Sequence, residues 1–213
     1  FEKRFAVRCA GNAYLIRYAD DYVACFEQEA DARAFLGAMT ERLAEFDLEI
    51  EPAKTALLRF GSQCLSKAVA RPHGERTFSF LGFTHYVGRS RRGRFVVGRR
   101  TDAKRMHKKL QLLSEHLRHL RPQGGNAMLA FFVRHVRGHI QYYGVSGNSR
   151  ALAGYLYAAS GLLFKWLNRR SQRRSLTWKR FTAYIHPMFP NARILHDLYP
   201  IPSWKTQTGS PMV

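Results

Sequence analysis

The sequence has few acidic residues, few cysteines and no long apolar run, and each shortage excludes a class of protein. Residues 61–213 hold 4 Asp and Glu against 27 Lys and Arg, whereas residues 1–60 hold 11 acidic and 8 basic residues. Three cysteines, with no Cys-x-x-Cys pair, argue against a disulfide scaffold and indicate reduced thiols in the cytoplasm. No apolar run approaches the roughly 18 residues of a membrane span, so we expect no membrane partner.

The large excess of basic residues is the feature of the composition that these exclusions leave to be explained. The formal net charge is +20, and the part after residue 60 carries all of the excess. A basic excess of this size predicts a polyanion partner, most simply nucleic acid. An anionic membrane is the rival partner, although no isolated amphipathic anchor helix is evident. A solvated basic face without a partner is the other alternative, and charge self-repulsion argues against it.

Two β-prone runs flank adjacent carboxylates near the start of the chain. Residues 14–26 read Tyr-Leu-Ile-Arg-Tyr-Ala-Asp-Asp-Tyr-Val-Ala-Cys-Phe, which predicts a hairpin with Ala19, Asp20 and Asp21 at its tip. Adjacent carboxylates repel each other, and a divalent cation offsets that cost. Mg²⁺ prefers carboxylate oxygens, and two such ions can clamp the oxygens of a phosphoryl transfer. The alternative is an ordinary turn, because aspartate is common in turns.

Hydrophobic periodicity predicts the elements that follow the hairpin. Residues 28–47 are expected to form a helix that covers one face of the hairpin, and residues 48–50 a short strand. Lys54 is either a surface lysine or an ammonium that meets substrate phosphate near the hairpin tip. Gly82 lies within β-prone residues 78–86, where it predicts a bulge, a close backbone approach or a simple packing glycine.

Three basic regions follow. Residues 89–100 predict an arginine-rich hairpin whose guanidinium groups can bind phosphates. Residues 102–170 predict three helices with apolar stripes for a shared core. The basic run at residues 168–175 is followed by Trp178, Phe181 and Tyr184. Such interleaving suits phosphates plus stacked bases, and a helix end with a solvated charge run is the competing interpretation.

Four histidines have the i, i+3 or i, i+4 spacing of metal ligands. They are His116, His119, His135 and His139. No third ligand is evident and no Glu follows the first histidine of either pair, so we favour histidines that face solvent or RNA over a zinc site.

The series of motifs resembles the C-terminal part of a bacterial group II intron reverse transcriptase/maturase. The matching segments are Tyr-Ala-Asp-Asp at 18–21, Lys-Thr at 54–55, Phe-Leu-Gly-Phe at 80–83, Gly-His-Ile-Gln-Tyr-Tyr-Gly at 138–144 and Lys-Trp-Leu-Asn-Arg-Arg at 165–170. The resemblance implies an α+β fold. Residues 1–100 would be the distal part of the polymerase palm, an antiparallel sheet with a covering helix. Residues 101–213 would be a three-helix thumb/maturase bundle with an irregular tail.

The resemblance also implies RNA-templated DNA synthesis from dNTPs on a DNA primer, with Mg²⁺, and binding of intron RNA to assist splicing. Asp20 and Asp21 would be the catalytic magnesium ligands. The implied substrate- and primer-binding residues are Tyr18, Ala19, Lys54, Phe80, Leu81, Gly82 and Phe83. The candidate RNA-binding residues are Arg91, Arg92, Arg94, Lys104, Arg105, Lys108, Lys109, Arg134, Arg137, Arg169, Arg170, Arg173 and Arg174.

The chain also departs from the family pattern. The family has a further metal-binding aspartate on an earlier palm strand and fingers that hold the template, and neither lies in residues 1–213. We therefore expect this chain alone to lack polymerase activity. Two other functions stay open: an RNA-binding splicing or folding helper without polymerase activity, and a reverse transcriptase of a phage-defence or CRISPR system.

Overall fold

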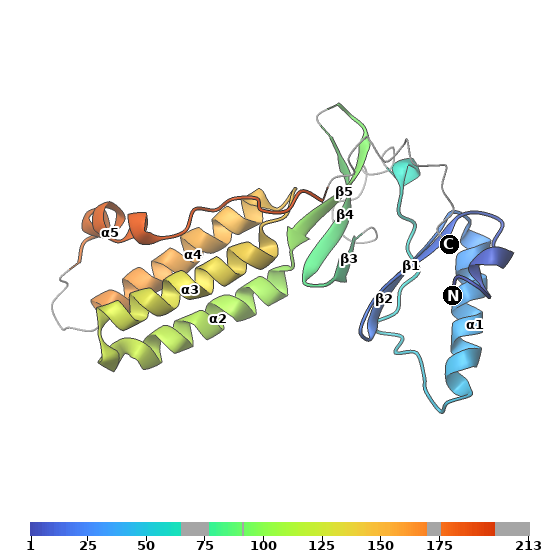
Figure 1. The fold of residues 1–213 in the computed structure, drawn as a ribbon, viewed down its shortest axis with the longest axis horizontal. Helices are drawn as coiled ribbons and strands as arrows, with labels where there is room; N and C mark the ends of the chain where they lie inside the picture. Colours follow the sequence, from blue (N-terminus) through green and yellow to red (C-terminus); the bar gives the residue numbers. More distant parts are fainter. Residues whose placement is uncertain (65–76, 91, 170–175, 199–213) are drawn as a thin grey trace. The chain divides into compact units, whose positions relative to one another are not determined.

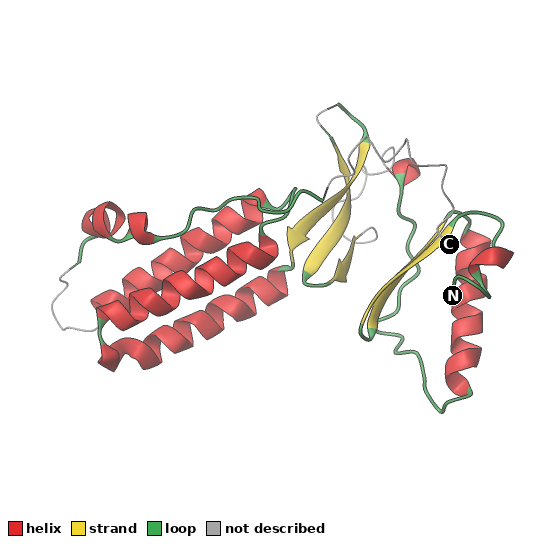
Figure 2. Ribbon diagram, in the orientation of Figure 1, coloured by secondary structure: helices red, strands yellow, loops and turns green. Residues whose placement is uncertain are grey.

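The protein has an α+β fold in a computed structural model, as the sequence predicts (Figures 1 and 2). The chain divides into two compact units, Phe1–Gly98 and Arg99–Val213. No helix of the described residues is both long and apolar enough to cross a membrane. The structure describes residues 1–64, 77–90, 92–169 and 176–198.

The first unit contains two small sheets and one long helix. β1 and β2 form one antiparallel sheet, and the second sheet has the order β3-β4-β5. The elements are the 3-10 helix Ala6–Arg8, β1 (Ala13–Tyr18), β2 (Asp21–Phe26), α1 (Glu29–Ala44), the 3-10 helix Ser62–Cys64, β3 (Thr77–Phe80), β4 (Phe83–Arg89) and β5 (Phe95–Thr101), whose last residues belong to the second unit.

The predicted hairpin and its covering helix are confirmed. In the β1–β2 pair Ala13 lies opposite Phe26, and cross-strand partners share one face of the sheet. The ring of Phe35, on α1, lies 5.4 Å from that of Phe26, and 5.3 and 5.1 Å from those of Phe1 and Phe5. This aromatic cluster holds one face of the hairpin against the helix.

Two expectations in this unit are wrong. Residues 48–50 form no strand, because the chain leaves α1 through Asp47 at a φ of 55° and the Leu48 N–H donates to the Leu43 carbonyl. Gly82 is not a mid-strand bulge. Leu81 and Gly82 have φ values of 49° and 78°, which is typical of the two-residue turn of a tight hairpin, here between β3 and β4.

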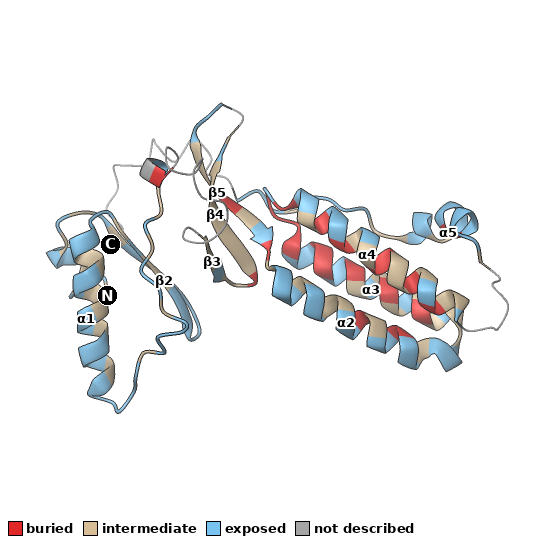
Figure 3. Cartoon of the chain, turned by 180° about the vertical axis from the view of Figure 1, so that it is seen from behind, coloured by how far each residue is buried: buried red, intermediate tan, exposed pale blue. Residues whose placement is uncertain are grey.

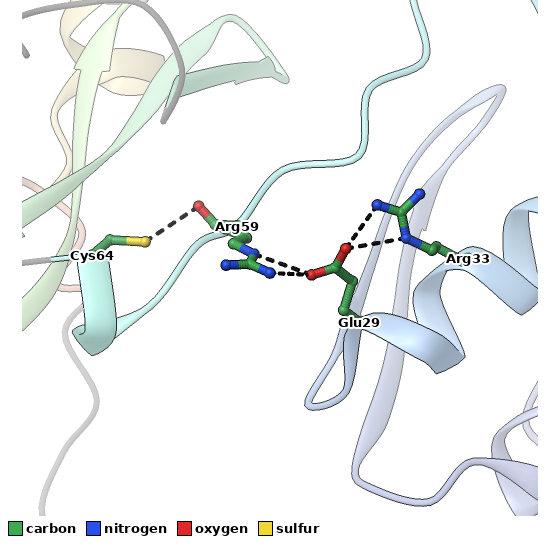
Figure 4. A network of polar contacts seen from close by, with 4 residues as sticks. All are labelled: Glu29, Arg33, Arg59 and Cys64. Carbon is green, nitrogen blue, oxygen red and sulfur yellow. Dashed lines mark hydrogen bonds and ion pairs between the residues drawn. The ribbon is translucent and has the colours of Figure 1, made fainter. Parts of the chain in front are cut away.

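A carboxylate at the start of α1 ties a distant loop to the helix (Figure 4). Glu29 accepts hydrogen bonds from Arg33 one turn along the helix and from Arg59, whose Nη2 lies 2.5 Å away. The Arg59 bonds, and then those of Arg33, hold the pKa of Glu29 below its ordinary value. The segment between Glu51 and Arg59, which carries Lys54, is thereby anchored at one end.

The second unit is a bundle of the three predicted helices, with a shorter fourth helix after them. α2, α3 and α4 contact one another pairwise, and in Figure 3 the buried residues gather where they face each other. Its core contains Leu113, Leu117, Met128, Phe132, Val136, Leu152, Tyr155, Ala159, Leu163 and Phe181. The elements are α2 (Ala103–Leu120), the 3-10 helix Arg121–Gln123, α3 (Gly125–Tyr143), α4 (Ser149–Asn168), α5 (Trp178–Tyr184) and the 3-10 helix His186–Met188.

The expectation that the paired histidines face solvent or RNA is wrong for His139. Its side chain is fully buried, and its ring stacks on that of Tyr155 at 3.5 Å. His135 is half-buried, and its Nε2 lies 2.7 Å from the Tyr155 hydroxyl. Both belong to the core because α4 supplies the tyrosine they pack against. His116 and His119 are exposed, as expected.

The chain beyond Pro187 has no strand or α-helix in its described part, yet it is tied down. Leu195 and His196 N–H groups donate to the Gly144 carbonyl at 2.6 and 3.0 Å. The Ser146 hydroxyl donates to Asp197 at 2.8 Å, and the Ser146 oxygen accepts from the Leu198 N–H at 2.6 Å. Residues 195–198 thus form a strap on the loop between α3 and α4.

Candidate functional site

The tip of the β1–β2 hairpin is a two-residue turn of Ala19 and Asp20. Tyr18 pairs with Asp21, which places Asp21 at the start of β2 and not in the turn itself as predicted. Ala19 has a φ of 54°, an unfavourable conformation for a residue with a Cβ. The Arg17 Nε donates to the Ala19 carbonyl at 2.8 Å, which stabilises the turn from the preceding strand.

The two carboxylates at this tip are open to solvent. Asp20 and Asp21 are exposed, and within the described residues neither side chain makes a hydrogen bond or ion pair. Their oxygens therefore fit a hard cation such as Mg²⁺, which takes carboxylate ligands and bridges to phosphates. A bound Mg²⁺ would supply Lewis-acid stabilisation of a phosphoryl oxygen.

The tip supplies fewer ligands than a two-ion centre needs. In the part of the chain that the structure describes, no three His, Cys, Asp or Glu side chains gather in a way that could hold a metal ion. A pair of clamped ions requires more carboxylate oxygens than this hairpin offers.

The hairpin's second face is apolar and uncovered. Tyr14, Ile16 and Tyr18 alternate along β1 on the face away from α1, and their exposed fractions are 64%, 56% and 65%. Contiguous exposed apolar surface marks a site of further packing or binding. Asp21 lies at the end of this face, opposite Tyr18. A segment or partner that covered the face would therefore lie close to the carboxylates.

The predicted primer-binding residues lie in two places within the first unit. Lys54 is exposed and makes no ion pair with another described residue. Phe80 and Phe83 are paired across the β3–β4 turn and are half-buried, with Leu81 and the buried Gly82 between them. β3, which carries Phe80, contacts β2, the strand that begins at Asp21.

Most of the predicted RNA-binding residues are exposed. Lys109 differs, because it is half-buried with its ammonium 5.7 Å from the centre of the Tyr143 ring, and desolvation lowers its pKa. The exposed candidates are Arg92, Arg94, Lys104, Arg105, Lys108, Arg134, Arg137 and Arg169. Four candidates lie outside the described residues: Arg91, Arg170, Arg173 and Arg174.

A family model covers most of the unit that carries the carboxylate tip. Residues 1–85 match the reverse transcriptase (RNA-dependent DNA polymerase) family. The match includes the β1–β2 hairpin, α1 and the β3–β4 turn. It ends before the arginine-rich residues 89–100 and before the helices of the second unit. A comparison with curated proteins gives no match. Residues 1–85 are therefore similar to a family of polymerases, whose members use nucleic-acid partners and, in general, divalent metal ions.

Several residues that stabilise one unit or the other were not recognised from sequence. Arg17 precedes the turn by two residues, which is the one local signal for its bond to Ala19. No local sequence pattern indicated the Glu29–Arg59 pair, since the two residues are thirty positions apart. Asn148 is buried, accepts from the Thr101 N–H at 2.8 Å and donates to the Tyr143 carbonyl, a role set by contacts distant in sequence.

Proposed function

We propose that this chain is the C-terminal part of a group II intron-encoded RNA-directed DNA polymerase that also binds intron RNA and assists its splicing. The observation that carries the proposal is the exposed Asp20–Asp21 tip inside the reverse transcriptase region. A nearly acid-free helical unit follows it, and Glu115 is the single acidic residue between positions 103 and 196.

In this proposal the two units have different roles. Residues 1–100 are the distal palm, in which Asp20 and Asp21 hold Mg²⁺ beside the primer end. Tyr18, Ala19, Lys54 and residues 80–83 line the primer and substrate site. Residues 101–213 are the thumb/maturase part, whose exposed lysines and arginines bind template and intron RNA through phosphates. The uncovered face with Tyr14 and Ile16 packs against further palm elements.

Primer extension on poly(rA)/oligo(dT) with Mg²⁺ and dTTP tests the polymerase part. We expect the isolated chain to give no synthesis, because one hairpin does not complete a two-ion site. In a longer protein that includes the fingers and the preceding palm strand, we expect activity that Asp20→Asn lowers by about a thousandfold. This corresponds to several kcal/mol of metal-dependent stabilisation.

Glu49→Gln is the matched control for that substitution. Glu49 is another exposed carboxylate of the first unit that belongs neither to β1 and β2 nor to the proposed primer site, and its loss is expected to leave synthesis unchanged. Clear synthesis by the isolated chain, or full activity of the longer protein with Asp20→Asn, would refute the polymerase proposal.

A second function, an RNA-binding helper without polymerase activity, is favoured by the same basic helical unit. It predicts splicing assistance that is indifferent to Asp20→Asn and to Mg²⁺ at the tip. Primer extension by the longer protein distinguishes the two, because the polymerase proposal alone requires synthesis that depends on Asp20.

A further inference from the structure

The second unit has an apolar groove that the roles above do not use. It lies between α4, α5 and the segment after α5, and its volume is about 400 Å³. A volume of this size is in the range of sites that take a small molecule or part of a larger one. The residues that matter for its chemistry are Leu156, Tyr157, Trp178, His186, Phe189 and Asn191.

Two aromatic side chains of the groove present ring surface to solvent. Tyr157 is 76% exposed, and Trp178 is 43% exposed. The Trp178 indole is fixed from behind, stacked on Phe181 at 5.2 Å and packed edge-on against Phe164 at 5.0 Å. A rigid ring with one free surface binds a planar partner at little entropic cost.

The same structure corrects one expectation about this region. Stacking on bases was one of two interpretations of Phe181, beside Trp178 and Tyr184, but Phe181 is fully buried and lies 5.9 Å from Phe189. It supports Trp178 from the core. Tyr184 is exposed and is not among the residues that line the groove.

The charge of the elements that form the groove indicates which class of molecule binds in it. Residues 149–196 contain no Asp or Glu. The described basic residues on the elements that form the groove are Arg150, Lys165, Lys179, Arg180 and Arg193. An apolar slot with exposed aromatic rings, on elements that carry cations and no Asp or Glu, is complementary to a flat group on a polyanionic chain. The Asn191 amide, which makes no hydrogen bond within the described residues, can meet the polar edge of such a group.

We propose that this groove holds one unpaired nucleobase of a single-stranded RNA, stacked between Tyr157 and Trp178, while the flanking cations bind its phosphates. The inference rests on the proposed function, since it names the part of the RNA that the helical unit takes. Bases in a duplex are already stacked and paired, so the site selects loops, bulges and ends over helical RNA.

The test compares RNA binding of the whole chain with that of Tyr157→Ala, measured by anisotropy with a fluorescein-labelled single-stranded RNA. We expect the variant to bind about 5- to 100-fold more weakly, as for other stacked bases. The slope of log affinity against log salt should stay the same, because no phosphate contact is lost. Affinity for a duplex RNA should also stay the same. The Tyr157 side chain is mostly solvated, so the variant keeps its fold, and thermal unfolding checks this.

Tyr142→Ala is the matched control, because it removes another exposed tyrosine of the same unit outside the groove. Equal single-strand affinity of Tyr157→Ala and Tyr142→Ala would overturn the proposal, and so would an equal loss on duplex RNA. The proposed function stands in either case as long as the wild-type chain binds RNA.

Should the wild-type chain bind no RNA, the proposed function fails and the groove is tested with adenosine 5′-monophosphate. The readout is the Trp178 indole N–H signal in NMR, assigned with Trp178→Phe. A shift that Tyr157→Ala removes supports the base site. No shift, or a shift that the variant retains, refutes it.

Discussion

At the scale of single residues, the buried histidines of the bundle have the clearest consequences. Burial, with the nearby Lys109 ammonium adding to it, lowers the pKa of His139 to about 3, and burial lowers that of His135 to about 4. Neither ring nitrogen of His139 has a hydrogen-bond partner within the described residues. His139 is thus a neutral core residue, and its ring contributes through stacking on Tyr155.

The folded protein takes up these protons at lower pH than the unfolded chain, in which a histidine titrates near pH 6.5. The free energy of unfolding that the two neutral histidines contribute is complete above about pH 6.5. It falls toward pH 4 by about 1.4 kcal/mol per pH unit and per histidine. We expect His139→Phe to keep the stack, raise stability at neutral pH and reduce that slope. Urea unfolding between about pH 7 and pH 4.5 measures it, and an unchanged slope would contradict the assignment.

At the scale of elements, the loop between α3 and α4 depends on a glycine. A Cβ at Gly144 would lie 2.5 Å from the Ile140 carbonyl oxygen and 2.9 Å from that of Arg193. Both neighbours are backbone, so they cannot move aside as a side-chain tip can. We expect Gly144→Ala to release the strap of residues 195–198 and to destabilise the protein by about 1–3 kcal/mol. Denaturant unfolding gives the free energy, and amide exchange at Leu195 and His196 reports the release.

Gly138, on the helix α3 that Gly144 follows, provides the control. A Cβ there meets nothing within 4 Å, so Gly138→Ala should raise stability by up to about 1 kcal/mol through helix propensity. If the two variants behaved alike, the strap would not be what requires glycine at position 144.

At the scale of the whole molecule, the basic charge is concentrated where acidic residues are missing. Lys104 and Lys108 lie one helical turn apart on the exposed side of α2, beside a shallow depression that His107 and Gln111 also line. Cations at this spacing bind successive phosphates, and each contact adds to the salt dependence of binding.

We expect the double substitution Lys104→Ala with Lys108→Ala to weaken RNA binding at low salt. The slope of log affinity against log salt should fall by up to about 1.4 for a single strand. Lys3→Ala with Arg8→Ala removes the same charge from the first unit and should leave the slope nearly unchanged. Anisotropy at several salt concentrations measures both, and equal slopes would argue against α2 as the RNA-binding helix.

Much of the candidate site follows from local sequence. The β-prone runs around Asp20 and the short turn between them are properties of neighbouring residues, and so the carboxylate tip was predicted. The Arg17 bond to the turn and the tie between Glu29 and Arg59 were not predicted, because several geometries of a long arginine side chain are compatible with the same sequence. Asp21 lies in the strand and not in the turn as predicted, because the turn consists of Ala19 and Asp20 alone.

The sequence by itself determined the helices, the hairpins and the uneven charge, because periodicity, turn chemistry and ionisation act over a few residues. Tertiary structure alone decided that His139 is buried, that Phe181 lies beneath Trp178, and that the last described residues fasten to Gly144. Each of these depends on residues far apart in the chain that meet in one packed core, where the available space and the hydrogen-bond partners are set by the whole unit.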